Sequence, residues 1–225
     1  MAQFYLVRHG QASFGAANYD QLSPLGHQQA RWLGEYFRDR GTRFDALITG
    51  DLVRHVETGQ GILDGLGVNL QADIQPGLNE FHFHHIVDAY LSAHPQETPS
   101  ADAPRAAFYR LLKKAMVLWR EGTLEGALPE TWQDFQDRVA AAMKHIRDHY
   151  AEHDKVLIVS SGGAMAMWVR HILRTADEVV MDLNLQIRNS SVTEGFFNSK
   201  VFRLSAFNQV PHLDRADRYQ AITHS

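Results

Sequence analysis

The chain has 225 residues, of which 44% are apolar and 21% charged, and its formal net charge is −4. It is long enough to bury a sizeable core, and its charge gives no sign of binding to nucleic acid. The absence of cysteine excludes disulfides, thiolate metal sites and cysteine nucleophiles. We see no secretory signal at the start and no apolar run of about 18 residues that would span a membrane, so we expect a soluble cytoplasmic protein.

Strand-like and helix-like patterns alternate along the first third of the chain. Ser23 and Pro24 favour the start of a helix, because serine caps free N–H groups and proline suits the first helical position. Gly41 favours the end of the same helix. The predicted elements are, in chain order, a strand at 3–8, a loop at 9–22, a helix at 23–40, a strand at 44–49, a helix at 51–66 and a strand at 69–74.

The region from about 75 to 130 differs in composition, since it carries most of the prolines and the patch ETPSADAP. We interpret it as an insertion with one helix at about 104–121, rather than as a separate domain. The patterns after it predict, in chain order, a helix at about 130–151, a strand at 155–160, a helix at 163–173 and a hairpin within NSSVTEGFFNSKVFRLSAF.

This order of elements predicts an α/β fold. Strands that alternate with helices imply a mostly parallel central sheet with helices on both faces. We see no internal repeat and no low-complexity tract, so we expect a single domain over residues 1–225 with one helical insertion. In such sheets, ligands bind beyond the carboxyl ends of the strands.

Polar and glycine residues follow the carboxyl ends of the predicted strands. Arg8 and His9 end the first strand, and Arg54 lies in the first turns of the helix after the second. Ser161 and Gly162 follow the strand after the insertion, where free N–H groups at a helix start would add positive potential. If these strands are neighbours, the groups converge on one rim. Such a rim suits a compact anion such as a phosphoryl group, because arginine offers paired donors to its oxygens.

A histidine in such a site can act as a nucleophile. A neutral imidazole nitrogen can displace an alcohol from phosphorus, and water can then hydrolyse the phosphohistidine. The leaving alkoxide needs a proton, so an acid must lie nearby. A strand that ends in Arg-His-Gly is, taken alone, commonly a salt bridge and a turn. The combination of the three groups is what favours a functional site.

The segment LVRHGQ resembles the signature of the histidine phosphatase superfamily, the phosphoglycerate mutase-like proteins, whose usual form is L-V-R-H-G-E/Q-T. LSPLGHQQARWLGEYF resembles the L-T-x-x-G-x-x-Q-A helix of this family, and ITGDLVRHVETG resembles S-x-L-x-R-A-x-Q-T-A. PGLNEFHF resembles the segment that carries the family's acid, and VLIVSSGGAM resembles V-x-V-S-H-G-G. The resemblance covers nearly the whole chain, with the motifs in order.

The resemblance implies a phosphoglycerate mutase-like fold and a role for individual residues. His9 would be the phosphorylated nucleophile, and Glu80 would donate the proton. Arg8 and Arg54 would clamp the phosphoryl oxygens. No metal or organic cofactor would be needed. The residues alone leave another interpretation of Glu80 open, since this carboxylate could instead pair with a neighbouring histidine.

The chain departs from the family at Ser161, where the family normally has a second histidine. A neutral hydroxyl can still donate one hydrogen bond to a phosphoryl oxygen, but it cannot carry positive charge. A charge-assisted hydrogen bond contributes roughly 1.5–3 kcal/mol, so the loss corresponds to about a 10- to 150-fold change in rate. Gly162, Gln11 and Ser13 are the other residues that we expect to contact the phosphoryl group or the substrate.

Three histidines follow Glu80 closely and allow several interpretations. We hypothesise that His82, His84 or His85 fills the place of the missing family histidine. Alternatively, these side chains line the substrate entrance. On a strand, His82 and His84 would share a face and could bind a metal, but no matching carboxylate pattern supports a metal site.

The sequence favours a phosphomonoesterase that acts through a phosphohistidine on a small or medium phosphorylated molecule. The alternative is a catalytically weakened relative that binds a phosphorylated ligand or partner, and Ser161 is its direct support. An esterase with Ser161 as nucleophile lacks the G-x-S-x-G pattern, because Val159 stands at its first glycine. A mutase is disfavoured because Gly15 stands where the family's mutases have asparagine. Whether the protein forms oligomers is not readable from the sequence.

Overall fold

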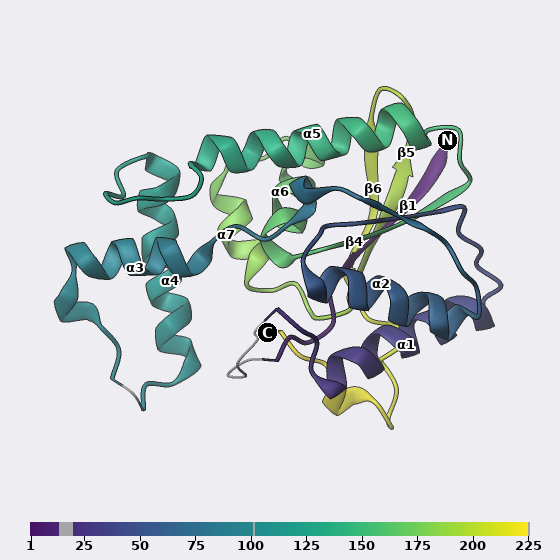
Figure 1. The fold of residues 1–225 in the computed structure, drawn as a ribbon, viewed down its shortest axis with the longest axis horizontal. Coiled ribbons are helices and arrows are strands. Elements are labelled where there is room, and N and C mark those ends of the chain that lie inside the picture. Colours follow the sequence, from purple (N-terminus) through teal and green to yellow (C-terminus); the bar gives the residue numbers. More distant parts are fainter. Residues whose placement is uncertain (14–19, 101, 225) are drawn as a thin grey trace.

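The computed structural model describes the whole chain except residues 14–19, 101 and 225. Its sheet has six strands in the order β3-β2-β4-β1-β5-β6 (Figure 1). The strands are β1 Ala2–Arg8, β2 Ala46–Thr49, β3 Ala72–Ile74, β4 Lys155–Ser160, β5 Val192–Phe197 and β6 Phe202–Gln209. The α-helices are α1 Pro24–Asp39, α2 Val53–Leu66, α3 Phe83–Ala93, α4 Arg105–Glu121, α5 Trp132–Tyr150, α6 Gly162–Leu173 and α7 Glu178–Asn184.

The predicted, mostly parallel sheet is confirmed. β1, β2, β3 and β4 run parallel to one another. The predicted hairpin forms the remaining two strands, with β5 antiparallel to β1 and β6 antiparallel to β5. Arg8 on β1 pairs with Ser160 on the neighbouring β4. The residues that follow these two strands therefore leave the sheet side by side.

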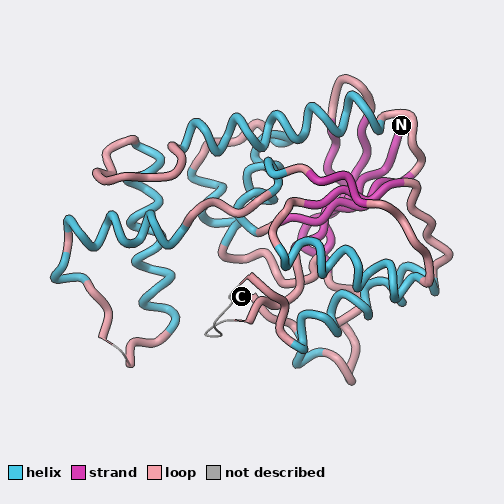
Figure 2. Tube along the Cα trace, viewed as in Figure 1, coloured by secondary structure: helices cyan, strands magenta, loops and turns pink. Residues whose placement is uncertain are grey.

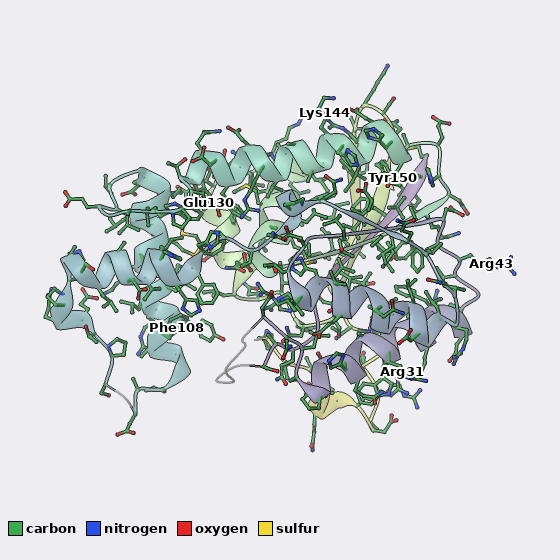
Figure 3. The ribbon with its side chains drawn as sticks, viewed as in Figure 1. Arg31, Arg43, Phe108, Glu130, Lys144 and Tyr150 are labelled. Atoms are coloured by element: carbon green, nitrogen blue, oxygen red, sulfur yellow. The ribbon has the colours of Figure 1, made fainter. Side chains whose placement is uncertain are left out.

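Helices cover both faces of the sheet, as predicted. Phe4 and Leu6 on β1 belong to the hydrophobic core shared with α5 and α6, whereas Val7 belongs to the core shared with α1 and α2. Successive side chains of a strand point to opposite faces, which explains why the central strands are predominantly apolar. Figure 2 shows the strands between the two helix layers, and Figure 3 labels Arg31 on α1 and Lys144 on α5 at opposite outer sides.

The helix starts follow local capping chemistry. Ser23 precedes α1, and its Oγ accepts a hydrogen bond from the N–H of Gly26 at 3.0 Å, as its residue type predicts. The helix predicted from 51 begins two residues later, at Val53. The backbone N–H of Asp51 instead donates to Oδ1 of Asn79 at 3.1 Å, which ties the start of α2 to the segment that precedes α3.

The predicted insertion contains α3 and α4, which extend from the rest of the molecule beyond α7 (Figure 1). α4 matches the helix predicted at 104–121. The strand interpretation of the histidine-rich segment is wrong, because His84 and His85 lie in the first turn of α3. α3 buries Ile86, Val87 and Tyr90, a helical spacing that the surrounding histidines obscure in the sequence. None of the helices in the described part of the chain is long and apolar enough to cross a membrane.

Candidate active site

His9 directly follows β1, at the carboxyl edge of the sheet. Its backbone N–H donates to the carbonyl of Ser160 at 2.9 Å, which fixes the loop to β4. Its ring Nδ1 lies 2.7 Å from the carbonyl oxygen of Gly10. Because a carbonyl oxygen can only accept, Nδ1 carries the proton, and Nε2 keeps a lone pair. The ring is only 4% exposed, so its orientation is held by packing as well.

The surroundings of His9 keep its imidazole neutral. Burial lowers the pKa of His9 well below its usual value, and the positive charges of Arg54 and Arg8 lower this pKa further. A neutral ring is the nucleophilic form. The site therefore supplies that form near neutral pH without removing a proton first.

Two buried arginines lie beside His9. Arg8 donates hydrogen bonds from Nη1 to the carbonyls of Ile187 and His224, the second at 2.5 Å. Arg54 forms an ion pair with Asp20, with 2.6 Å between Nη1 and Oδ1. Carbonyls carry no net charge, so these two contacts do not neutralise Arg8, whereas Asp20 compensates part of the charge of Arg54.

Glu80 reaches the same site from the segment before α3. The backbone N–H of Gly163 lies 3.1 Å from both carboxyl oxygens, and the N–H of Phe81 lies 3.2 Å from Oε1. Burial raises the pKa of Glu80, although the Gly163 N–H and the charges of Arg54 and Arg8 act in the opposite direction. A carboxyl group with a raised pKa keeps its proton to higher pH, so it is suited to donating that proton to the leaving group of a substrate.

The glycines at the start of α6 permit this close approach. A Cβ atom on Gly163 would lie 2.2 Å from Oε1 of Glu80, and one on Gly162 would lie 2.7 Å from Oδ1 of Asn184. Both distances are too short for two non-bonded atoms. The helix start can thus face the carboxyl group and Arg8 only because both positions lack side chains.

Ser161 is fully buried, and its partner is a histidine that the sequence interpretation did not identify. Oγ of Ser161 lies 2.6 Å from Nε2 of His55, a fully buried residue on α2. The His55 ring centroid lies 5.7 Å from that of His9. The sequence contained one sign of this partner. In the pattern S-x-L-x-R-A-x-Q-T-A, alanine follows the arginine, whereas in this chain His55 follows Arg54.

The hypothesis that His82, His84 or His85 fills this place stays a prediction. His82, His84 and His85 are exposed at the start of α3. In the described residues, no group of three or more histidine, aspartate or glutamate side chains is arranged to hold a metal ion. His84 is within α3 and His82 directly precedes it, so the two do not share a strand face.

Gln11 and Ser13 support the loop after His9 in this structure. Oε1 of Gln11 accepts a hydrogen bond from Ser23 Oγ at 2.8 Å, and Ser13 Oγ donates to the carbonyl of Leu22 at 3.0 Å. Their predicted contact with a phosphoryl group stays a prediction. Gly15, on which the argument against a mutase rested, lies outside the described residues.

Comparison with known sequences gives one family. The sequence model of the histidine phosphatase superfamily (branch 1) matches residues 4–210. The chain is 29% identical over 201 residues to a probable phosphoglycerate mutase GpmB of Erwinia tasmaniensis. This alignment covers 86% of this chain and 84% of that protein. It is 25% identical over 231 residues to an Escherichia coli protein of the same name, with 95% and 96% covered.

Comparison with solved structures supports the fold. A putative alpha-ribazole-5'-P phosphatase from Escherichia coli superposes with a TM-score of 0.68 at 19% identity, covering 93% of this chain and 97% of that one. A phosphoserine phosphatase from Entamoeba histolytica superposes with a TM-score of 0.65 at 17% identity, covering 95% and 100%. The predicted phosphoglycerate mutase-like architecture is confirmed.

Proposed function

Because the chain belongs to the histidine phosphatase superfamily (branch 1), we propose that it is a phosphomonoesterase that works through a phosphohistidine on a small or medium phosphorylated molecule. The observation that carries this proposal is the neutral His9 ring, whose Nδ1 proton is held by Gly10 and whose neighbours are two buried arginines that also act on Glu80. No metal or organic cofactor takes part in the proposed reaction.

The first step transfers the phosphoryl group to His9. The Nε2–P bond forms while the bond between phosphorus and the ester oxygen breaks, and Arg8 and Arg54 stabilise the charge on the phosphoryl oxygens. Glu80 gives its proton to the leaving alkoxide. In the second step, water attacks phosphorus and Glu80 takes back a proton. Inorganic phosphate leaves, and Nε2 of His9 regains its lone pair.

Ser161 and His55 together take the place of the second family histidine in this proposal. Nδ1 of His55 is buried without a hydrogen-bond partner among the described residues. A buried N–H without an acceptor is rarer than an unused lone pair, so the proton belongs on Nε2, which donates to Ser161 Oγ. Ser161 then keeps its own O–H to donate to a phosphoryl oxygen. Burial and Arg54 lower the pKa of His55 well below its usual value, so the pair acts uncharged.

The experiment that tests the proposal is hydrolysis of p-nitrophenyl phosphate in the presence of a metal chelator. The intact protein should release nitrophenol and form an acid-labile phosphoprotein, and His9→Ala should do neither. His149→Ala, which removes an exposed histidine of α5, is the matched control and should keep full activity. Release that requires metal, or persists in His9→Ala, would contradict the proposal.

The same experiment separates the proposed phosphatase from two other functions. A phospho-ligand binding protein would release no nitrophenol but would still be protected against heat by phosphate. A mutase would transfer the phosphoryl group between hydroxyls of 3-phosphoglycerate, a test motivated by the names of the similar curated proteins. Release of inorganic phosphate at the full rate of substrate loss would support the phosphatase.

A further inference from the structure

A second group of positive side chains lies at the opposite end of the sheet from His9. It surrounds a cavity of about 220 Å³ between α5, the end of α6 and the turn that joins β5 to β6, which we call the hairpin pocket. Phe197 at the end of β5 pairs with Ala2 at the start of β1. The seven residues of β1 therefore separate this pocket from His9, a distance of roughly 20 Å.

The lining of the hairpin pocket carries a net positive charge. Of its ten lining residues, four carry a permanent positive charge and none is acidic. The four are Arg147, Arg174, Lys200 and Arg203, and none of them forms an ion pair with a described carboxylate. Asp148 lies near enough to interact with Arg147, but its ion pair is with Lys144.

Ordinary helix electrostatics account for two of these cations. Arg147 lies in the last turn of α5 and Arg174 directly follows α6, and the partial negative charge of a helix end favours cations at both positions. Lys200 and Arg203 come from the β5–β6 hairpin, so a different explanation is needed for these two. The overall charge of −4 also shows that the cluster is not a sample of a basic surface. Like charges repel, and an anion in the pocket would remove that repulsion.

The lining of the pocket combines charged and apolar groups. Arg147 lies over the ring of Phe202, with 5.9 Å between its Cζ and the ring centroid, which limits the positions of the guanidinium group. Met143, Ile172 and Phe202 add apolar surface to the lining. Arg174 has φ 54° and ψ 41°, the left-handed conformation in which helices commonly end, and this directs the chain away from α6 at the pocket.

We propose that the hairpin pocket is a second binding site, for a small organic polyphosphate. The paired donors of Arg147, Arg174 and Arg203 suit phosphoryl oxygens, and Lys200 adds a compact point charge. The apolar part of the lining would hold the uncharged part of the ligand. The site is separate from the proposed catalytic site, so it holds whether or not the protein is a phosphatase. α6 connects the two, with its first residues beside Glu80 and its end at the pocket.

The test is isothermal titration of the intact protein with methylenediphosphonate, a diphosphate analogue that hydrolysis cannot consume. Two sites should appear. The double variant Lys200→Glu/Arg203→Glu should weaken one of them by about tenfold or more, and Arg8→Gln should weaken the other. The first two positions are exposed, so these changes should not disturb folding.

A matched control separates a built site from general attraction. Arg31→Glu/Arg215→Glu makes the same change in net charge at exposed positions outside the pocket, and should leave both sites unchanged. The proposal is overturned if Lys200→Glu/Arg203→Glu weakens no site of the intact protein, or if the control double variant loses affinity equally. A single site that is lost in Lys200→Glu/Arg203→Glu and kept in Arg8→Gln would support the hairpin pocket and would contradict the proposed catalytic site instead.

Discussion

The hydrogen bond between His55 and Ser161 allows a quantitative test of the proposed catalytic site. Its length of 2.6 Å and the complete burial of both residues mean that water cannot replace either partner. In the proposed mechanism, Ser161 touches the phosphoryl group and His55 acts only through Ser161. Ser161→Ala should therefore abolish the contribution of both residues, whereas His55→Ala should abolish only the orientation of the hydroxyl.

The expected magnitudes follow from the charges involved. A hydrogen bond from a hydroxyl to a charged phosphoryl oxygen contributes roughly 1.5–3 kcal/mol, so Ser161→Ala should lower kcat by about 10- to 150-fold. The bond between His55 and Ser161 joins two neutral groups and contributes roughly 0.5–1.5 kcal/mol, so His55→Ala should lower kcat by about 2- to 10-fold. The double variant should be no slower than Ser161→Ala alone, because the two residues act in series.

The assay is steady-state hydrolysis of p-nitrophenyl phosphate by the single and double variants, with circular dichroism as a check that each is folded. His55→Gln retains an N–H donor and should recover most of the activity. Ser161→His/His55→Ala, which recreates the family arrangement, should exceed Ser161→Ala by about tenfold. If the effects of Ser161→Ala and His55→Ala multiply instead, His55 contacts the substrate directly and the reasoning is wrong.

Three further predictions concern Glu80. Glu80→Gln should slow the hydrolysis of alkyl phosphates by about 10²- to 10⁴-fold. It should slow the hydrolysis of p-nitrophenyl phosphate far less, because nitrophenolate leaves without a proton. Measurement of kcat on both substrates tests this, and equal slowing would contradict the acid role. Phosphoenzyme formation from an alkyl phosphate should slow as pH rises through the pKa of Glu80, which burial raises above its usual value, and on the acid side it should slow only below the lowered pKa of His9; single-turnover rates that rise as pH rises through the pKa of Glu80 would refute this. Gly163→Ala should reproduce the substrate pattern of Glu80→Gln, because the added Cβ would meet Oε1 at 2.2 Å; unchanged kcat on alkyl phosphates would exclude the close approach.

Much of the fold was predictable because its signals are local. The buried strands are short apolar runs, and Ser23 marks the start of α1 by its own hydrogen bond. α7 was not predicted, since it has seven residues and buries only Val180 and Met181, too few for a periodic pattern. α3 was missed because histidines and phenylalanines at its start imitate the alternation of a strand.

The residues of the candidate site were predictable only where they belong to a recognisable sequence motif. Arg8, His9, Arg54 and Glu80 all carry recognisable motifs, and the structure brings them together. His55 could not be found in this way, because its meaning depends on Ser161, which is distant in the sequence and adjacent in space. The carbonyls that hold Arg8 were equally unpredictable, since any residue type at Ile187 and His224 would present the same backbone group.

The anchoring of Glu80 bears on how substrate preference could change within this architecture. Arg138 on α5 donates to the carbonyls of Gly77 and Asn79, so the residues leading to Glu80 are fastened to the body of the protein. The N–H of Gly163 then fixes the carboxyl group itself. The segment that carries Glu80 is thus held independently of the two projecting helices that follow it. Those helices could be lengthened, trimmed or exchanged for others while the reactive groups keep their places, which makes them the natural starting point for engineering new selectivity.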